Sequence, residues 1–289
     1  MTTRQRQLVT LVRPPRWRVW PFIVGVLVIA ATLGAIKYER FYYHVTAQEA
    51  SREIARTTFA ATIRGGKPVN LLQYQQHGAK NQPLIFFTSG DGGWSPFCAD
   101  IAAHLATKGY TVVAFDVKNY LTTYANSQQP VTPEELGRDY ADLLQAARQQ
   151  PGVDAVRPVT LSGWSLGAGY SVLAATDAKL QGQVARVVGI SLPIENELAW
   201  KPTDSIIYLT HGVPHEKIFD AHDYLSKLSV PLILLNATDD DTSPLSDANS
   251  LLAKAAGPKQ LFPVTAHGHH FEGGEEAFYQ SLDLSLTNH

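Results

Sequence analysis

From residue 83 onward, short apolar runs rich in β-branched residues alternate with segments whose apolar positions recur at helical spacing. The strand-like runs are 83–90, 110–116, 158–163, 185–192, 230–238 and 259–264. The helical segments are 96–108, 133–150 with Thr132 as candidate N-cap, 166–178, and a last one from about Glu275. Strands alternating with helices predict a largely parallel sheet with helices on both faces.

Two further patterns add elements to this series. Strand-like segments near 57–63 and 69–74 flank "RGGKP", a hairpin-type turn. The segment 204–228 is longer than a plain crossover between two core strands and predicts an extra strand and helix.

The N-terminal region carries arginines followed by an uncharged apolar run at 19–36, "VWPFIVGVLVIAATLGAI". At 1.5 Å per residue the run reaches roughly 27 Å, close to the hydrocarbon core of about 30 Å. The arginine excess on the N-terminal side places the N-terminus in the cytoplasm. The pattern favours an uncleaved signal anchor, with a cleaved signal peptide as the alternative.

These patterns predict four regions. A basic cytoplasmic segment covers 1–18, a membrane anchor 19–36, a juxtamembrane linker 37–56 and one α/β domain 57–289. In this topology the domain after residue 38 is exported.

The net charge and the cysteine count exclude some classes of function. The net charge of −2 does not favour a nucleic-acid partner, and 17% charged with 45% hydrophobic residues is ordinary for a globular chain. The single cysteine, Cys98, excludes an internal disulfide and every metal motif built on several cysteines.

The most informative motif is Gly163-Trp164-Ser165-Leu166-Gly167, between a predicted strand and a predicted helix. Gly-x-Ser-x-Gly in this context is the nucleophile-elbow pattern, in which a tight turn lifts the serine hydroxyl above the sheet. The alternative is a glycine-rich turn that serves only close packing.

A second loop, "TSGDGGW" at 88–94, follows the first central strand. A hydrolase of this architecture takes one oxyanion donor from such a loop, and a second from the residue after the nucleophile. The backbone amides of Asp91 and Leu166 are the candidates. A phosphate-binding loop is the alternative, although the Gly-Lys-Ser/Thr of a P-loop is missing.

Two later loops offer an acid and a base. "DDDTSP" begins at Asp239, and Asp240 stands four residues before Pro244, as the acid does in many hydrolases; Asp239 and Asp241 remain alternatives. "TAHGHHFEGG" follows the last strand, and His269 is the candidate base, with His270 as alternative. The chain order serine, aspartate, histidine is that of α/β-hydrolases.

Two other classes compete with a serine enzyme. The histidines of the last loop, together with the aspartate run, could bind a divalent metal. A non-catalytic binding domain on a decayed hydrolase fold is the second competitor, although every triad position is present.

Three loops together, "FTSGDGGW", "GWSLGAG" and "GHHFEGG", resemble the VirJ/AcvB-type virulence proteins of Gram-negative bacteria from about Pro83 to the C-terminus. The resemblance implies an exported α/β-hydrolase domain, here in the periplasm and attached to the inner membrane. That family typically reads Gly-Tyr-Ser-Phe-Gly-Ala-Asp at the elbow, whereas Gly169 stands here at the aspartate's position. The segment 120–133 is also longer than usual.

The resemblance further implies hydrolysis of the aminoacyl ester of aminoacyl-phosphatidylglycerol by Ser165, His269 and Asp240, with no cofactor. A general carboxylesterase or thioesterase acting on a soluble substrate is the alternative, and a periplasmic interaction protein is another. No protein partner is indicated by the sequence. The candidate substrate contacts are Gly92, Trp94, Tyr120, Tyr208 and His211.

Overall fold

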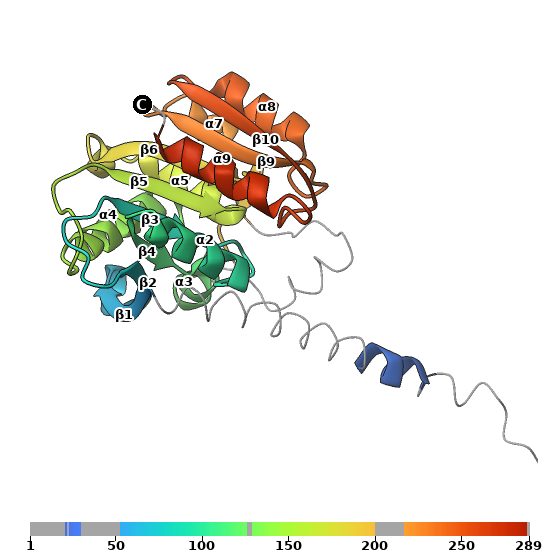
Figure 1. Cartoon of the computed structure of the whole chain (residues 1–289), viewed down its shortest axis with the longest axis horizontal. Helices are drawn as coiled ribbons and strands as arrows, with labels where there is room; N and C mark the ends of the chain where they lie inside the picture. Colours follow the sequence, from blue (N-terminus) through green and yellow to red (C-terminus); the bar gives the residue numbers. More distant parts are fainter. Residues whose placement is uncertain (1–20, 22, 30–52, 126–128, 200–216, 288–289) are drawn as a thin grey trace, which may run out of the picture. The chain divides into compact units, whose positions relative to one another are not determined.

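The computed structural model of the chain describes Pro21 and residues 23–29, 53–125, 129–199 and 217–287. The chain divides into two compact units, Met1–Thr46 and Ala47–His289. In the second unit an eight-stranded sheet has the order β1-β2-β4-β3-β5-β6-β9-β10 (Figure 1). All neighbouring strands from β4 to β10 are parallel, whereas β1–β2 and β2–β4 are antiparallel.

The strands of this sheet are β1 (Ile54–Thr62), β2 (Pro68–Gln76), β3 (Leu84–Thr88), β4 (Thr111–Phe115), β5 (Val159–Trp164), β6 (Val184–Ile190), β9 (Leu232–Asp239) and β10 (Lys259–His267). A separate antiparallel pair consists of β7 (Glu195–Glu197) and β8 (Ile218–Asp220). The α-helices of this unit are α2 (Pro96–Thr107), α3 (Val117–Tyr124), α4 (Pro133–Arg148), α5 (Leu166–Ala175), α7 (His222–Leu225), α8 (Leu245–Lys254) and α9 (Glu275–Thr287).

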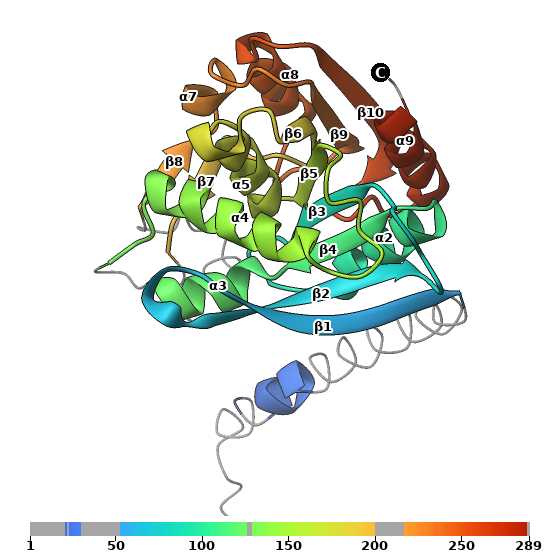
Figure 2. The same ribbon diagram turned by 90° about the vertical axis from the view of Figure 1, so that its left-hand side faces the viewer.

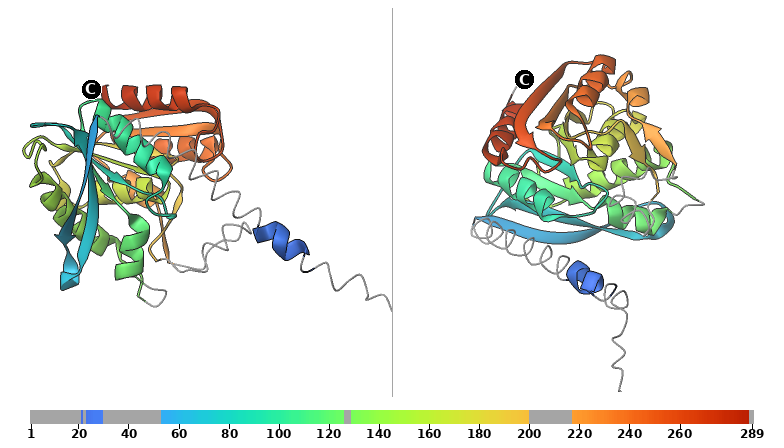
Figure 3. Two further views of the ribbon diagram at one scale, coloured as in Figure 1. Left: turned by 60° about the horizontal axis from the view of Figure 1, so that its bottom comes forward. Right: turned by 90° about the vertical axis from the view of Figure 1, so that its right-hand side faces the viewer.

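Helices cover both faces of the large sheet. Helices α2 and α9 lie on one face, and α4, α5 and α8 lie on the other (Figures 1 and 2). Strand β1 runs along one edge (Figure 3). Because both faces are covered, β3, β4 and β5 are buried along their full length, which explains their continuous apolar sequences.

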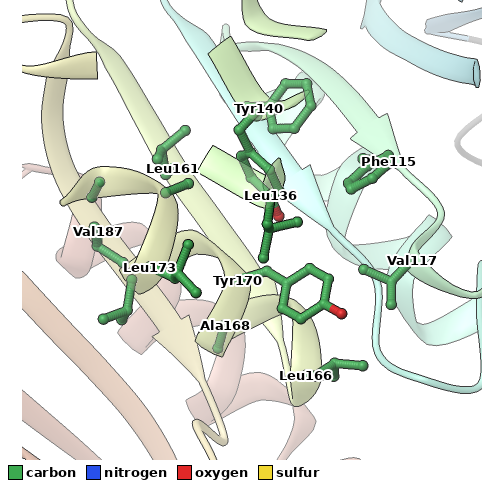
Figure 4. Close-up of a cluster of buried hydrophobic side chains, with 14 of the residues drawn as sticks. Phe115, Val117, Leu136, Tyr140, Leu161, Leu166, Ala168, Tyr170, Leu173 and Val187 are labelled. Carbon is green, nitrogen blue, oxygen red and sulfur yellow. The ribbon is translucent and has the colours of Figure 1, made fainter. Parts of the chain in front are cut away.

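Two apolar cores result. The larger one lies between the sheet and α4 and α5 and includes Phe115, Tyr140, Leu161 and Tyr170 (Figure 4). The smaller one lies under α2 and α9. Buried side chains of this size stabilise a fold by roughly 1.5–3 kcal/mol each, so the two cores hold the central strands firmly in register.

Helix starts follow from local chemistry. Thr132 and Glu135 form a capping box at α4, with the Thr132 hydroxyl accepting from the Glu135 amide and the Glu135 carboxylate from the Thr132 amide. The Asp116 carboxylate accepts from the Asn119 amide and caps α3. The predicted helix at 133–150 and its N-cap are thus confirmed.

The sequence prediction was incomplete at the start of β1 and in three further elements. Strand β1 begins at Ile54, three residues before the predicted domain start, because its full length pairs with β2. Helices α3 and α8 and strand β7 were not predicted. In the segment 204–228 the structure shows β8 and α7, in agreement with the extra strand and helix, while 204–216 lies outside the described residues.

Of the N-terminal region, Pro21 and residues 23–29 are described, and they are helical and exposed. Among the described residues, no helix has the length and apolar character needed to cross a bilayer. The predicted anchor at 19–36 falls largely outside these residues and stays a prediction.

Candidate active site

Ser165 stands between β5 and α5 with a backbone that few residues adopt. Its φ is 55° and its ψ is −126°, so this non-glycine residue occupies a strained conformation. Its amide donates to the Ile190 carbonyl over 2.9 Å, and the carbonyl of Ser165 accepts from the Ala168 amide at the start of α5. A serine held in this way is the geometry expected of a nucleophile elbow.

The two flanking glycines make the turn sterically feasible. A Cβ on Gly163 would lie 2.2 Å from the Gly167 carbonyl oxygen, and one on Gly167 would lie 2.2 Å from the Thr88 carbonyl oxygen. Any side chain at either position would therefore push α5 away from β5 or from the end of β3. The motif brings the amide end of α5 into direct contact with the carboxyl ends of the central strands.

An acid and a base meet beside the elbow. The Nδ1 atom of His269 lies 2.8 Å from Oδ2 of Asp240, and the Asp240 side chain is fully buried. With Nδ1 donating to the carboxylate, Nε2 is left as a proton acceptor. The Nε2 atom is buried and has no hydrogen-bond partner among the described residues, which leaves it free for a serine hydroxyl or a leaving group.

The turn after β9 holds Asp240 in place. Oδ1 of Asp240 accepts from the amides of Thr242 over 2.9 Å and Ser243 over 3.1 Å, so Oδ2 is left for His269. Asn236, the one polar side chain in the apolar run "LILLNA", donates to the Ser243 carbonyl over 3.1 Å. The Ser243 hydroxyl donates to the Ser191 carbonyl. The sequence interpretation missed Asn236 and Ser243, although an isolated polar residue in a buried strand is a usable signal.

The surroundings of Asp240 shift the pKa of its carboxyl in opposite directions. Burial alone would raise the pKa of this carboxyl. The hydrogen bond and charge of His269, together with the amides of Ser243 and Thr242, outweigh burial and hold the pKa below its usual range. Asp240 is therefore a carboxylate at neutral pH and can stabilise an imidazolium at His269.

The other acids and histidines of these loops have different surroundings. Asp239 pairs with His267 over 2.7 Å, but both side chains are more than 70% exposed. Asp241 is exposed. The ring of His270 packs against Trp164 and Phe97. Of the alternatives left open by the sequence, only Asp240 and His269 form a buried pair in the described part of the chain.

The loop after β3 lies directly over the elbow. A Cβ on Gly90 would lie 3.4 Å from the Cβ of Ser165, and the Gly93 amide donates back to the Gly90 carbonyl over 3.0 Å. Asp91 is inside this turn. Leu166 is the first residue of α5, so no carbonyl of the helix accepts from its amide. The two predicted oxyanion donors thus belong to segments that flank Ser165.

The candidate substrate contacts differ in position. Gly92 is exposed, with open space where a side chain would be. The indole N–H of Trp94 donates to the Tyr74 hydroxyl over 3.3 Å, and its ring packs on Phe87 and Tyr74, so Trp94 is turned toward β2 and the smaller core. Tyr208 and His211 lie outside the described residues.

For Tyr120 the structure gives a role other than the predicted substrate contact. The ring is 1% exposed and packs on Phe115, and the hydroxyl donates to Oδ2 of Asp139 over 2.6 Å. Asp139 also accepts from Nε of Arg64 over 2.7 Å. Tyr120 is part of a buried polar network that joins α3 to α4 and to the β1–β2 hairpin, because its hydroxyl is needed to satisfy a buried carboxylate.

In the described ranges, no group of three or more His, Cys, Asp and Glu side chains is arranged to bind a metal ion.

The model of a protein family described as "Bacterial virulence protein (VirJ)" matches residues 82–286 of the sequence. The chain belongs to the VirJ family. Two uncharacterised proteins from strains of Mycobacterium tuberculosis are each 27% identical to this VirJ-family chain over 192 residues, covering 65% of the chain and 63% of each relative. The chain thus matches somewhat less than two thirds of the length of these relatives.

Solved structures share the fold of this VirJ-family domain. The esterase domain of a Rhodothermus marinus protein has a TM-score of 0.55 at 18% identity, covering 80% of this chain and 97% of its own. A dienelactone hydrolase assigned in Klebsiella pneumoniae has a TM-score of 0.56 at 17% identity, with the same coverage. The domain therefore has the α/β-hydrolase fold expected from the sequence.

Gly169, where the VirJ pattern typically has an aspartate, has a structural explanation here. A Cβ on Gly169 would lie 1.8 Å from Oδ1 of Asn196, a residue of β7 that is 1% exposed. The amide of Asn196 donates to the carbonyls of Pro193 and Ile194, so the side chain cannot easily move aside. An asparagine from β7 therefore fills the space over the first turn of α5.

We expect Gly169→Ala to destabilise the domain by about 2 kcal/mol, because overpacking a filled site typically costs 1–3 kcal/mol. Gly169→Ala combined with Asn196→Gly should be more stable than the sum of the two single changes predicts. Urea unfolding of the four proteins measures this coupling. Simple additivity would show that Asn196 does not occupy this space.

Proposed function

We propose that this protein is a membrane-anchored periplasmic serine esterase that hydrolyses the aminoacyl ester of aminoacyl-phosphatidylglycerol. The observation that carries the esterase proposal is the buried Asp240–His269 pair next to a strained serine, with Nε2 of His269 free to accept a proton. Family membership and the names of the structural neighbours support the same reaction class.

In the proposed reaction the Ser165 hydroxyl attacks the ester carbonyl carbon while Nε2 of His269 takes its proton. The Asp240 carboxylate stabilises the resulting imidazolium. The amides of Asp91 and Leu166 donate to the oxyanion, a contribution of about 3–4 kcal/mol per donor in other enzymes. The tetrahedral intermediate then collapses with cleavage of the bond between the acyl carbon and the glycerol oxygen, and the imidazolium protonates that oxygen to give the hydroxyl of phosphatidylglycerol.

Deacylation repeats these steps with water as the nucleophile. His269 removes a proton from the water, the ester bond to Ser165 breaks, and the serine oxygen takes the proton back. The products are the free amino acid and phosphatidylglycerol. No cofactor takes part in these steps.

The lipid substrate rests on two sequence features. The resemblance to VirJ/AcvB-type proteins implies it, and the apolar run at 19–36 would keep the domain beside a bilayer. A carboxylesterase or thioesterase with a soluble substrate would use the same triad and is the second candidate.

The first test treats the full-length protein in detergent with a fluorophosphonate probe, which forms a bond between phosphorus and the serine oxygen and releases fluoride. We expect one adduct, located on Ser165 by peptide mass spectrometry and missing in Ser165→Ala. A folded protein that forms no adduct would contradict the esterase proposal.

The second test incubates the protein with vesicles that contain lysyl- or alanyl-phosphatidylglycerol and measures the released amino acid. Release that requires Ser165 supports the lipid substrate. Hydrolysis of p-nitrophenyl esters or acyl thioesters without release from vesicles would instead favour the soluble-substrate enzyme.

A further inference from the structure

Trp164, the last residue of β5, directly precedes Ser165. Its backbone pairs with Ile190 of β6, and its side chain is 6% exposed. The indole lies on the face of the sheet that carries α2 and α9, in the smaller apolar core. The nucleophile-elbow pattern accepts any residue at this position, so the motif alone predicts no role for Trp164.

The indole contacts the loop that carries the base. Its N–H donates to the backbone carbonyl of His269 over 3.1 Å. The ring centroids of Trp164 and His269 are 5.2 Å apart, and those of Trp164 and His270 are 4.7 Å apart. One side chain thus binds the backbone of His269 and packs against its ring.

The same ring supports the oxyanion loop. A Cβ on Gly90 would lie 3.0 Å from Cε3 and Cζ3 of Trp164, so the Gly90 backbone lies close against the edge of the indole. Phe97, in the first turn of α2, packs edge-on against Trp164 with centroids 5.2 Å apart. The Trp164 side chain is therefore in contact with the segments that carry the proposed base and one oxyanion donor. Its backbone is joined to the proposed nucleophile, Ser165, by the peptide bond.

Backbone hydrogen bonds hold the base loop on either side of His269, since the Gly268 amide donates to the Asp239 carbonyl over 2.7 Å and the Phe271 amide to the Gly268 carbonyl over 3.4 Å. The amides of His267 and Glu272 each donate to the carbonyl of the other over 2.9 Å, and this closes the loop at its root. Gly268 and Phe271 both have φ of 62°, so the backbone between them turns sharply. Of the backbone–backbone bonds that hold the described loops, none begins or ends at His269. The indole is the group that holds the His269 carbonyl.

We propose that Trp164 is a positioning residue, which sets the distance of the His269 imidazole and of the 90–91 loop from Ser165 through its N–H bond and its ring. The proposal rests on the esterase function proposed above. Asp240 fixes the orientation of the imidazole from one end, and Trp164 fixes the backbone of His269 from the other.

The test compares Trp164→Phe, which keeps an aromatic ring but removes the N–H donor, with the unchanged full-length protein in detergent. A displacement of about 1 Å can lower a rate about 100-fold, so we expect kcat for a p-nitrophenyl ester to fall about 10- to 100-fold. The KM should change less than about threefold, because Trp164 is 6% exposed and offers a substrate almost no surface. The rate of fluorophosphonate labelling should fall in parallel with kcat.

Tyr74→Phe is the matched control. It also removes one hydrogen bond to an indole N–H in the same apolar core, that of Trp94, but has no contact with the histidine loop. We expect the Tm of the two variants to agree within about 4 °C, a difference of roughly 1 kcal/mol in a domain of this size. Only Trp164→Phe should lose activity.

Each result is decisive for one of the two proposals. If Trp164→Phe has normal kcat, or if it loses kcat only together with a much lower Tm than Tyr74→Phe, the positioning role is wrong and Trp164 is a packing residue. If the unchanged protein neither hydrolyses the ester nor labels at Ser165, the esterase function itself is wrong.

Discussion

Asp240→Asn should lower kcat for ester hydrolysis about 10⁴-fold, the loss found when the acid of a serine triad is replaced by its amide. The neutral amide can donate to Nδ1 of His269, which forces the proton onto Nε2, where the serine proton must be accepted. The side chain is fully buried and pairs with His269 over 2.8 Å, so solvent cannot substitute for the lost charge.

Asp239→Asn is the matched control, since Asp239 also pairs with a histidine at 2.7 Å but is exposed. An exposed ion pair contributes about 0–1 kcal/mol, so its removal should change kcat by less than about fivefold. Both variants are assayed with the same p-nitrophenyl ester. Equal losses in the two proteins would show that the assigned triad register is wrong.

The lowered pKa of Asp240 also affects stability. The pKa of the Asp240 carboxyl is lower in the folded protein than the value of about 3.9 in the unfolded chain, so its ionisation stabilises the fold at any pH above about 3.9. This contribution is lost as the pH falls through the pKa of the folded state. The free energy of unfolding of Asp240→Asn should therefore approach that of the unchanged protein as the pH falls below about 4.

The second large effect concerns stability. Arg64→Met should destabilise the domain by about 3–5 kcal/mol, because it removes the cationic partner of a buried carboxylate. Nε of Arg64 lies 2.7 Å from Oδ2 of Asp139, whose side chain is 1% exposed, and Nη1 lies 2.7 Å from Oε1 of Glu135. Urea unfolding at pH 7 measures the change.

Arg157→Met is the control for Arg64→Met. Arg157 and Asp154 form a surface pair at 3.6 Å, and its loss should cost less than about 1 kcal/mol. Adding Asp139→Leu to Arg64→Met should recover part of the loss, since no unpaired charge then remains buried. If Arg64→Met and Arg157→Met have equal stability, the Arg64–Asp139 pair does not hold the fold.

Acidification should reduce the Arg64→Met penalty. Burial raises the pKa of Asp139, and the bonds from Tyr120 and Arg64 oppose this without cancelling it. Without Arg64 the carboxyl is easier still to protonate, and a neutral Asp139 needs no cation. The difference in unfolding free energy between the two proteins should therefore shrink as the pH falls toward the unfolded pKa of about 3.9.

The elements that could be predicted from sequence are those whose signal is local. Strands β3, β4 and β5 appear as continuous apolar runs because both their faces are buried, and α4 carries its own capping box. The four loops that form the candidate site also lie where parallel strands end, which topology alone brings together.

The positions that sequence analysis missed depend on contacts between distant segments. The role of Tyr120 depends on Asp139 and on Arg64, which comes from a hairpin at the sheet edge. The space over Gly169 is filled by Asn196 from another sheet. No periodicity in a single segment reports such contacts, so a tyrosine near a predicted pocket looked like a substrate contact.

The separate β7–β8 pair has a consequence for how this fold can diversify. Ser165, Asp240 and His269 follow β5, β9 and β10 of the large sheet, whereas Asn196 belongs to the small one and packs on the helix that begins at the nucleophile. Mutations in β7 can change what surrounds that helix and leave the strands that carry the triad in register. The small sheet can therefore diverge in sequence while the serine, the aspartate and the histidine keep their places in the large one.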